Sequence, residues 1–287
     1  MSDVARLAGV SAQTVSRVAA GSEHVRPDTR ERVLRAMNQL GYSPNRAAQA
    51  LRRGSFKTIG VLTQQIQRTG EALTTAGVLE AATAADYAVN LVQVERPASD
   101  DLREAVYRLS HQAIDGLVVV QAGRAGREQL VLPPAMPVAV SDSTLVDYYP
   151  SASADQAGGV RNAVKHLLEL GHHTVHHVCG PEDSQSSLIR RATWTRTLQE
   201  VGREVPEPVP GGWEAAAGYE AGLRLAADPE VTAVFCANDE LALGLIRAMH
   251  EQGRRVPRDV SVVGFDGLAL GEYSFPPLTT VRQDFKR

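Results

Sequence analysis

Two polar side chains near the start of the chain, Gln13 and Arg17, lie four residues apart in the stretch GVSAQTVSRVAAG. At about 100° per residue in a helix, they share a face with Ala12 and Ser16, whereas the valines lie on the opposite face. An amide and a guanidinium on one face can donate several hydrogen bonds and accept others. The pattern predicts a short amphipathic helix whose polar face binds a partner, with a plain solvated face as the alternative.

Three helices are predicted around these residues. Ser11 is a favoured N-cap residue directly before the quoted helix, and Gly9 ends the preceding pattern, SDVARLAG. The third pattern, PDTRERVLRAMNQLGY, begins at Pro27 and ends at Gly41. Because only residues 9–11 connect the first two helices, the pair forms a helix-turn-helix. The apolar residues expected to pack these helices together are Val4, Leu7, Ala8, Val10, Val15, Val18, Val33, Leu34, Met37 and Leu40.

The charge of the chain is unevenly distributed. Residues 1–55 contain nine Arg and four acidic residues, whereas the rest of the 287 residues contains 21 basic and 29 acidic ones. A basic head on an acidic body suggests that the head meets a polyanion. The two cysteines, Cys179 and Cys236, lie in apolar runs and indicate neither a disulfide framework nor a zinc site. With no secretory signal or membrane-spanning run, we expect a cytoplasmic protein without a membrane partner.

Strand and helix patterns alternate from Lys57 onward. Apolar, β-branched runs separated by helical stretches are typical of βαβ units, in which helices cover both faces of parallel sheets. Seven such runs favour two doubly wound lobes, with a crossover near residues 150–154. The runs are TIGVLT, YAVNLVQV, DGLVVV, PVAVS, TVHHVCG, VTAVFCA and VSVVGF.

Several motifs closely resemble the LacI/GalR family of transcriptional regulators, in order and in spacing. In the head and hinge they are DVARLAGVSAQTVSRV and VRPDTRERVLRAMNQLGYSPNRAAQALRRG. In the core they are ELGHHTVHHVCGP, FCANDELALGLIRAM, VSVVGFD and PPLTTVRQDF. The resemblance implies an α/β protein with an all-α helix-turn-helix head, a hinge helix and a two-lobed doubly wound parallel-sheet core like that of periplasmic binding proteins.

The expected division of the chain follows from this resemblance. Residues 1–43 are assigned to the DNA-binding domain, and residues 44–57 to the hinge helix and linker. Residues 58–150 form the first core lobe and residues 151–279 the second, with residues 280–287 returning to the lobe junction. The resemblance also implies that the first helix begins upstream of Met1 and that the core continues beyond Arg287.

The resemblance places the second helix in the DNA major groove, with Ala12, Gln13 and Arg17 at base-reading positions. The chemistry fits, because Gln can pair with adenine, Arg with guanine, and Ala with a thymine methyl group. Side chains that hold phosphates without reading sequence are expected at Ser11, Thr14 and Ser16.

In the hinge, the family resemblance implies a helix that folds when two subunits lie side by side on DNA. Within NRAAQALRR, it assigns packing across the dyad to Ala47, Ala48 and Leu51, and insertion into a minor-groove step to Leu51. A plain linker is the alternative. The hinge residues expected to contact DNA or the partner helix are Asn45, Arg46, Ala48 and Leu51.

For the core, the resemblance implies a small effector bound between the lobes, at the carboxyl ends of parallel strands. Carboxylates and Arg can hydrogen bond to vicinal hydroxyls, and Trp213 can stack on a sugar ring. Asp266 as a strand-end cap, Trp213 as ordinary core and Asn238 as a helix cap are the alternatives. The matching positions are Asp142, Ser186, Arg190, Trp213, Asn238, Asp266 and Gln283.

The sequence therefore predicts a repressor of sugar-utilisation genes that a small sugar releases from a palindromic DNA operator, with a galactoside as the favoured effector. We expect a homodimer, with a higher oligomer left open, and no cofactor or metal. The histidines of HHTVHH straddle a turn and a strand, so a solvated strand entry is favoured over a metal site. The alternatives are a cytosolic sugar- or nucleotide-processing α/β enzyme and a transport-type sugar-binding protein. The sequence shows none of the expected nucleotide or nucleophile motifs, and the basic head argues against the transport type.

Overall fold

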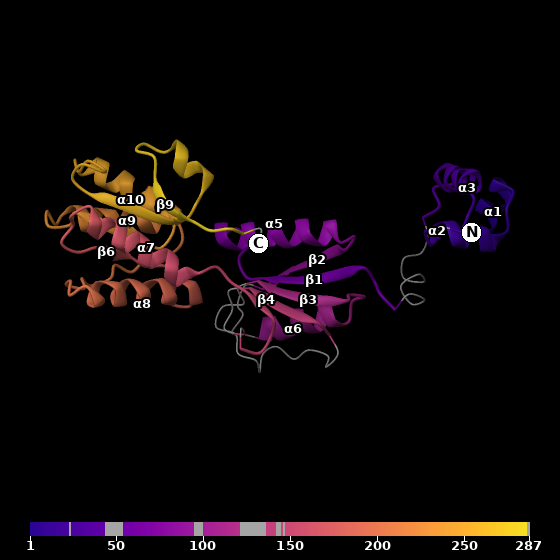
Figure 1. Ribbon diagram of the computed structural model, residues 1–287, viewed down its shortest axis with the longest axis horizontal. Coiled ribbons are helices and arrows are strands. Elements are labelled where there is room, and N and C mark those ends of the chain that lie inside the picture. The colour runs from indigo at the N-terminus through magenta and orange to yellow at the C-terminus, as the bar shows by residue number, and fades with distance from the viewer. Residues whose placement is uncertain are drawn as a thin grey trace. The chain divides into compact units, whose positions relative to one another are not determined.

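The computed structural model describes residues 1–22, 24–43, 54–94, 100–120, 136–141, 145 and 147–285. The chain forms two compact units, Met1–Lys57 with Ala113–Asp115 and Thr58–Gln112 with Gly116–Arg287. The first contains a helical head, and the second is an α/β core with two parallel sheets (Figure 1). The predicted fold class is confirmed, whereas the predicted domain limits stay predictions.

The head contains three helices, α1 (Ser2–Ala8), α2 (Ala12–Ala19) and α3 (Pro27–Gln39). The predicted capping residues are where the helices begin and end. Ser11 accepts a hydrogen bond from the Thr14 backbone N–H at 3.2 Å, which satisfies one free donor at the start of α2. Gly9 follows α1 with a φ of 62° and Gly41 follows α3 with a φ of 58°, a left-handed conformation that favours glycine.

Small residues pack the three head helices closely. Ala5 and Ala36 are buried, whereas the prediction that Leu7, Leu34 and Leu40 are buried is wrong, since their exposed fractions are 48%, 46% and 47%. Leu7 and Leu34 project about 110° away from the centre of the buried face of their helices. Leu40 lies beyond the last residue of α3, where the chain turns away. The buried head core consists of Val4, Ala5, Ala8, Val15, Val18, Val33, Ala36 and Met37.

Because the Ser11 cap holds the start of α2, we expect Ser11→Ala to destabilise this helix by about 1 kcal/mol. Hydrogen exchange of the α2 amides, measured by mass spectrometry on the full chain, should become about fivefold faster. Gln39→Ala changes an exposed residue at the end of α3 and serves as the control. Unchanged exchange in Ser11→Ala would show that the cap contributes nothing measurable.

The first core sheet has the strand order β2-β1-β3-β4-β5, with every neighbouring pair parallel. Helices α5 and α6 lie on its opposite faces (Figure 1). The short strand Ser151–Ala152 joins this sheet, although the predicted division assigns it to the second lobe. The elements are β1 (Thr58–Thr63), α5 (Thr69–Ala84), β2 (Ala88–Gln93), α6 (Asp100–Ser110), β3 (Gly116–Val120), β4 (Val138–Ser141) and β5 (Ser151–Ala152).

The second sheet has the order β6-β7-β8-β9 and is also parallel throughout. Strand β7 is buried on both faces, because Val234 and Cys236 pack in one apolar cluster while Ala233 and Phe235 pack in another. Residues of α9 and α10 join the first cluster, and residues of α7 and α8 join the second. The elements are α7 (Gln156–Glu169), β6 (His176–Val178), α8 (Gln185–Glu200), α9 (Ala215–Ala226), β7 (Ala233–Cys236), α10 (Asp239–Glu251), β8 (Ser261–Asp266), the 3₁₀ helix η2 (Ala269–Tyr273) and β9 (Thr279–Arg282).

The helical and strand patterns read from the sequence omit α8, β5 and β9. Helix α8 buries polar side chains, including Ser186, Ser187 and Arg190, alongside Trp194 and Leu198. A helix that buries polar groups lacks the regular apolar spacing by which a helix is recognised. Two of these polar residues, Ser186 and Arg190, line the cavity that α8 borders.

The segment that precedes β1 is held by a single carboxylate, that of Asp115. Its oxygens accept hydrogen bonds from the Ser55 hydroxyl at 2.5 Å and from the backbone N–H groups of Phe56 and Lys57 at 2.7 and 2.9 Å. Burial acts to raise the pKa of Asp115, but these hydrogen bonds outweigh it and the pKa is lowered. They hold Lys57 at a φ of 52°, which is uncommon for a residue other than glycine.

Among the residues that the structure describes, no helix combines the length and the apolar character needed to span a membrane.

Candidate functional site

Helix α2 presents the predicted DNA-contacting residues on its outer face. Ala12, Gln13 and Arg17 are exposed, and Thr14 and Ser16 are half-buried beside them. The hydroxyls of Ser11 and Thr14 lie 2.9 Å apart and hydrogen bond to each other, which fixes the start of this face. The structure thus brings together the six predicted head residues, whose role in binding DNA stays a prediction. The predicted hinge residues Asn45, Arg46, Ala48 and Leu51 lie outside the described residues.

In the core, a cavity of about 260 Å³ is lined by residues of both lobes. Several lining residues come at or just after the ends of strands β1, β7, β8 and β9. Parallel strands bring their carboxyl ends to one edge of a sheet, where ligands of such folds bind. Asp142 lies outside the described residues. The other predicted effector residues all line this cavity: Ser186, Arg190, Trp213, Asn238, Asp266 and Gln283.

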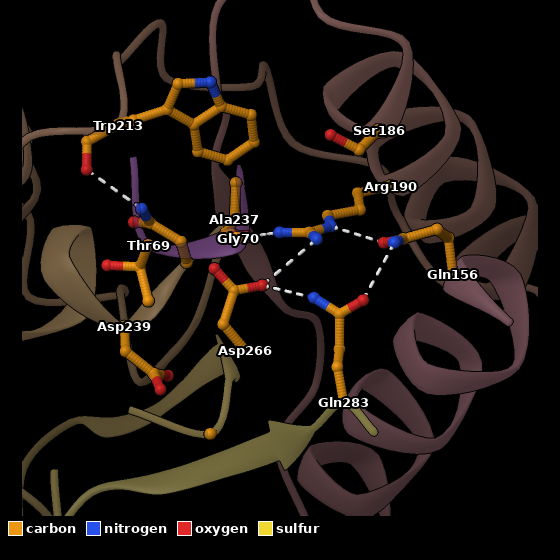
Figure 2. A network of polar contacts seen from close by, with 12 residues as sticks. Thr69, Gly70, Gln156, Ser186, Arg190, Trp213, Ala237, Asp239, Asp266 and Gln283 are labelled. Atoms are coloured by element: carbon orange, nitrogen blue, oxygen red, sulfur yellow. Dashed lines mark hydrogen bonds and ion pairs between the residues drawn. The ribbon is translucent and has the colours of Figure 1, made fainter. Parts of the chain in front are cut away.

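Four polar side chains on one side of the cavity form a closed ring of hydrogen bonds, which we call the polar ring (Figure 2). Arg190 donates to Gln156 at 2.8 Å and contacts Asp266 at 3.2 Å. Gln283 donates to Asp266 at 2.6 Å and accepts from Gln156 at 3.0 Å. Arg190 also donates to the Ala237 carbonyl. Residues of α7, α8 and β8, together with the residues directly after β7 and β9, therefore hold one guanidinium and one carboxylate in place.

Asp266 is the most perturbed member of the polar ring. Burial raises its pKa to about 6, although the Arg190 charge opposes the shift. Its φ of 112° is rare for a residue other than glycine, and it lies at the end of β8. Backbone strain of this kind is concentrated at functional sites. Asp266 therefore combines strain, burial and a position on the cavity wall.

Trp213 and Asn238 border the cavity next to the polar ring. The Arg190 guanidinium carbon lies 5.6 Å from the centroid of the Trp213 ring and 3.9 Å from that of Phe265. Trp213 is half-buried against the apolar core and also lines the cavity. Asn238 accepts a hydrogen bond from the Leu241 N–H at 2.9 Å, so it caps α10, and it donates to the Trp213 carbonyl at 2.9 Å. The capping interpretation of Asn238 is correct, and its role toward an effector stays a prediction.

Sequence reasoning missed the cavity residues contributed by the first lobe. They come from the loop after β1 and the first turn of α5, and Gln156 and Glu240 of the second lobe were missed as well. The signal available for the first group was its place directly after the buried strand TIGVLT, at a carboxyl end. The missed first-lobe residues are Gln65, Gln67, Arg68, Thr69, Gly70 and Glu71.

The histidines of HHTVHH point to separate partners. His172 contacts the Thr232 and Ser261 hydroxyls at 3.0 and 2.9 Å, whereas the His177 ring contacts the Phe235 carbonyl at 2.9 Å. Complete burial lowers the pKa of His177 to about 4, so it is neutral at pH 7. In the part of the chain that is described, no group of His, Cys, Asp or Glu side chains is arranged to hold a metal.

Both cysteines are buried. Burial raises the pKa of the Cys179 thiol to about 11, and it also raises that of Cys236. A buried thiol with a raised pKa is a packing residue and not a nucleophile.

The helical head and the α/β core each match a known protein family. Residues 1–45 match the family described as bacterial regulatory proteins, lacI family, and residues 164–287 match the periplasmic binding protein-like domain. The lactose operon repressor of Escherichia coli (strain K12) is 36% identical over 293 residues, covering 99% of this chain and 80% of that protein. The transcriptional repressor PurR of Haemophilus influenzae (strain PittEE) is 31% identical, covering 98% of this chain and 85% of that protein.

Two solved structures are similar to this protein over nearly the whole chain. The crystal structure of the lac repressor dimer bound to operator and the anti-inducer ONPF has a TM-score of 0.88 and 34% identity, covering 99% of this chain and 87% of that one. The complex of the regulator CelR with cellobiose has a TM-score of 0.71 and 30% identity, covering 99% and 88%. With a helix-turn-helix head, a two-lobed parallel-sheet core and this similarity along its length, the chain belongs to the lacI family of bacterial regulatory proteins.

Proposed function

We propose that this protein is a homodimeric transcriptional repressor that binds a near-palindromic operator through α2. A neutral sugar, with a galactoside as the favoured class, binds in the core cavity and weakens operator binding. The lac repressor is a dimer bound to operator in its solved structure, which supports the DNA-binding part. The protein is thus a regulator and not an enzyme. Because a bacterial chromosome lies in the cytoplasm, the protein acts there.

The exposed face of α2 supports operator recognition. Gln13 and Arg17 stand on the solvent side of a capped helix, where each can reach base edges in a major groove. One helix reads too few base pairs for genomic specificity, so two copies related by a two-fold axis are required. Higher oligomers are left open.

The polar ring beside Trp213 is the observation that carries the sugar proposal. Fixed donors and acceptors match vicinal hydroxyls, and the indole offers an apolar wall for a sugar face. Among the described lining residues there are two cations and four carboxylates. Such a balance disfavours phosphates and other anions. The cations are Arg68 and Arg190, and the carboxylates are those of Glu71, Glu214, Glu240 and Asp266.

A purine effector is the second candidate, because a PurR repressor is among the relatives. A gel shift with DNA from upstream of the protein's own coding region, repeated with sugars and purines, separates the two. We expect a sugar to release the DNA, because an effector that binds the closed lobes better than the DNA-bound state shifts the population away from DNA. Calorimetry with galactose, lactose, allolactose, glucose, cellobiose, maltose and a purine identifies the class. Binding of the purine with none of the sugars contradicts the proposal.

The raised pKa of Asp266 predicts that effector binding depends on pH. If the ionised carboxylate accepts hydroxyl donors, sugar affinity is full near pH 7.5 and falls roughly tenfold per pH unit below about 6. The shift also means that the contribution of Asp266 to folding stability is full below its unfolded pKa of 3.8 and is lost as the pH rises through about 6. Calorimetry at pH 5.0 and 7.5 tests the binding effect. Asp266→Asn should remove the pH dependence, and equal wild-type affinities at both pH values would exclude this role.

A further inference from the structure

One buried carboxylate close to the cavity, that of Asp239, is not part of the polar ring. Asp239 is the first residue of α10 and is 0% exposed. Its neighbours Asn238 and Glu240 line the cavity, whereas Asp239 does not belong to the cavity wall. A buried carboxylate is costly unless hydrogen bonds compensate for the lost water, so the partners of Asp239 indicate its role.

The oxygens of Asp239 hold the backbone turn that follows Asp266. Oδ2 accepts a hydrogen bond from the Leu268 N–H at 2.5 Å. Oδ1 accepts from the Thr280 hydroxyl at 2.5 Å, and that hydroxyl accepts from the Gly267 N–H at 3.3 Å. One carboxylate therefore holds the two N–H groups after Asp266, one directly and one through a hydroxyl. We call Asp239 and Thr280 the turn support.

The turn has a backbone conformation that residues with side chains rarely adopt. Asp266 has a φ of 112° and Gly267 has a φ of 77°. Strained backbone of this kind persists only where the surrounding contacts impose it. The hydrogen bonds of the turn support supply such contacts directly after Asp266. Strand β8 is also built around the carboxylate, since a Cβ at Gly264 would collide with Asp239 Oδ1.

The turn support and the polar ring hold different parts of Asp266. In the ring, Arg190 and Gln283 contact the Asp266 carboxylate at 3.2 and 2.6 Å. The turn support contacts the backbone directly after Asp266, and Figure 2 shows Asp239 and Arg190 on opposite sides of Asp266. If the turn relaxed to a common negative φ, the Asp266 carboxylate would move away from both ring partners. The place of this carboxylate in the cavity wall therefore depends on the turn support.

We propose that the turn support positions Asp266 for the effector and thereby sets the affinity for the effector. This inference rests on the proposed effector-responsive function. Neither Asp239 nor Thr280 lines the cavity, so both are positioning residues that act through Asp266. Without the Thr280 hydroxyl, the Gly267 N–H loses its acceptor and Asp239 loses a donor. The turn then leaves its strained conformation, and the cavity loses a fixed carboxylate.

Exchanges at Thr280 separate the hydroxyl from the shape of the side chain. The probe for calorimetry on the full chain at pH 7.5 is the ligand, from the panel of sugars and a purine, that binds the wild-type protein most tightly. Thr280→Val keeps the shape and should weaken binding at least fivefold, whereas Thr280→Ser keeps the hydroxyl and should bind within twofold of the wild type. Thr279→Val changes the exposed neighbour in β9 and is the matched control, expected to bind like the wild type. Normal binding by Thr280→Val, or equally weak binding by Thr280→Ser, overturns the inference.

A double-mutant cycle shows whether the turn support acts through Asp266. Asp266→Asn alone should weaken binding at least tenfold, and in that background Thr280→Val should cost less than a further twofold. Asp239→Ala should follow Thr280→Val in both backgrounds, with melting curves to establish that each variant is folded. The Thr280 variants decide the test if Asp239→Ala does not fold.

An equal loss in the two backgrounds would mean that the turn support acts independently of Asp266, which overturns the inference while the proposed function stands. If neither a sugar nor a purine binds the wild-type protein, the proposed function fails and this inference fails with it.

Discussion

Replacing Arg190 with alanine is expected to abolish the response to the effector and to lower the free energy of unfolding of the core by about 3–5 kcal/mol. The side chains of Arg190 and Asp266 are only 4% and 7% exposed. Without Arg190, the Asp266 carboxylate keeps Gln283 as a hydrogen-bond donor but loses the opposing charge. From the residue types alone, Arg190→Ala would be expected only to lose its response to the effector. Because the Arg190–Asp266 pair is buried, the variant should also lose folding stability.

Thermal melting followed by circular dichroism measures that cost. At pH 8, where Asp266 of the wild-type protein is ionised, the melting temperature of the core should fall by about 10 °C in the variant. The neighbouring Arg191 provides a matched control, because its side chain is 44% exposed and its nearest carboxylate oxygen, on Glu182, is 3.9 Å away. Arg191→Ala should change the melting temperature by no more than about 2 °C.

Gel shifts below the melting temperature of the Arg190 variant test its response. Operator binding should persist, because the predicted base-reading residues lie in the head, while the sugar no longer releases the DNA. Release of DNA at the wild-type sugar concentration would show that Arg190 is not needed for the response. A stability loss below about 1 kcal/mol would show that groups other than Arg190 stabilise the buried Asp266 carboxylate.

Replacing Arg17 with alanine should weaken operator binding by roughly 1–3 kcal/mol for each half-site and relax discrimination at one symmetric pair of base positions. Arg17 is exposed on α2 near Gln13 and the capped start of the helix. A guanidinium there can pair with guanine O6 and N7, which alanine cannot replace. Because a dimer carries two copies, the loss over the whole operator is about twice that for one half-site.

Fluorescence anisotropy with operator and scrambled DNA, at one fixed salt concentration, measures both effects. Binding to scrambled DNA should change little, so that the specificity ratio falls. Arg32→Ala removes an equivalent exposed charge from α3 and is the control for charge alone. An equal loss on both DNAs would identify Arg17 as a phosphate contact.

The local features of this protein could be predicted from the sequence, because each depends on a few neighbouring residues. The Ser11 cap, Gly9 and Gly41 in left-handed conformations, and Pro27 in the first turn of α3 are short-range effects of backbone geometry. The apolar strand runs were equally clear, since strands buried on both faces, such as β7, consist of continuous apolar residues. Helix α8 could not be recognised from the sequence, because Arg190 and the buried serines of this helix interrupt the apolar spacing.

What the sequence by itself determined is the fold class, the order of the elements other than α8, β5 and β9, and, through family resemblance, the side chains of one side of the cavity. Tertiary structure alone decided which partners those side chains meet: Arg190, Asp266, Gln156 and Gln283 come from separate segments and close a ring only when the strand ends converge. The same holds for Thr69 and Glu240, which are 171 residues apart in the chain. Such pairings depend on long-range packing, and burial by surrounding elements, not residue type, shifts the pKa of Asp266.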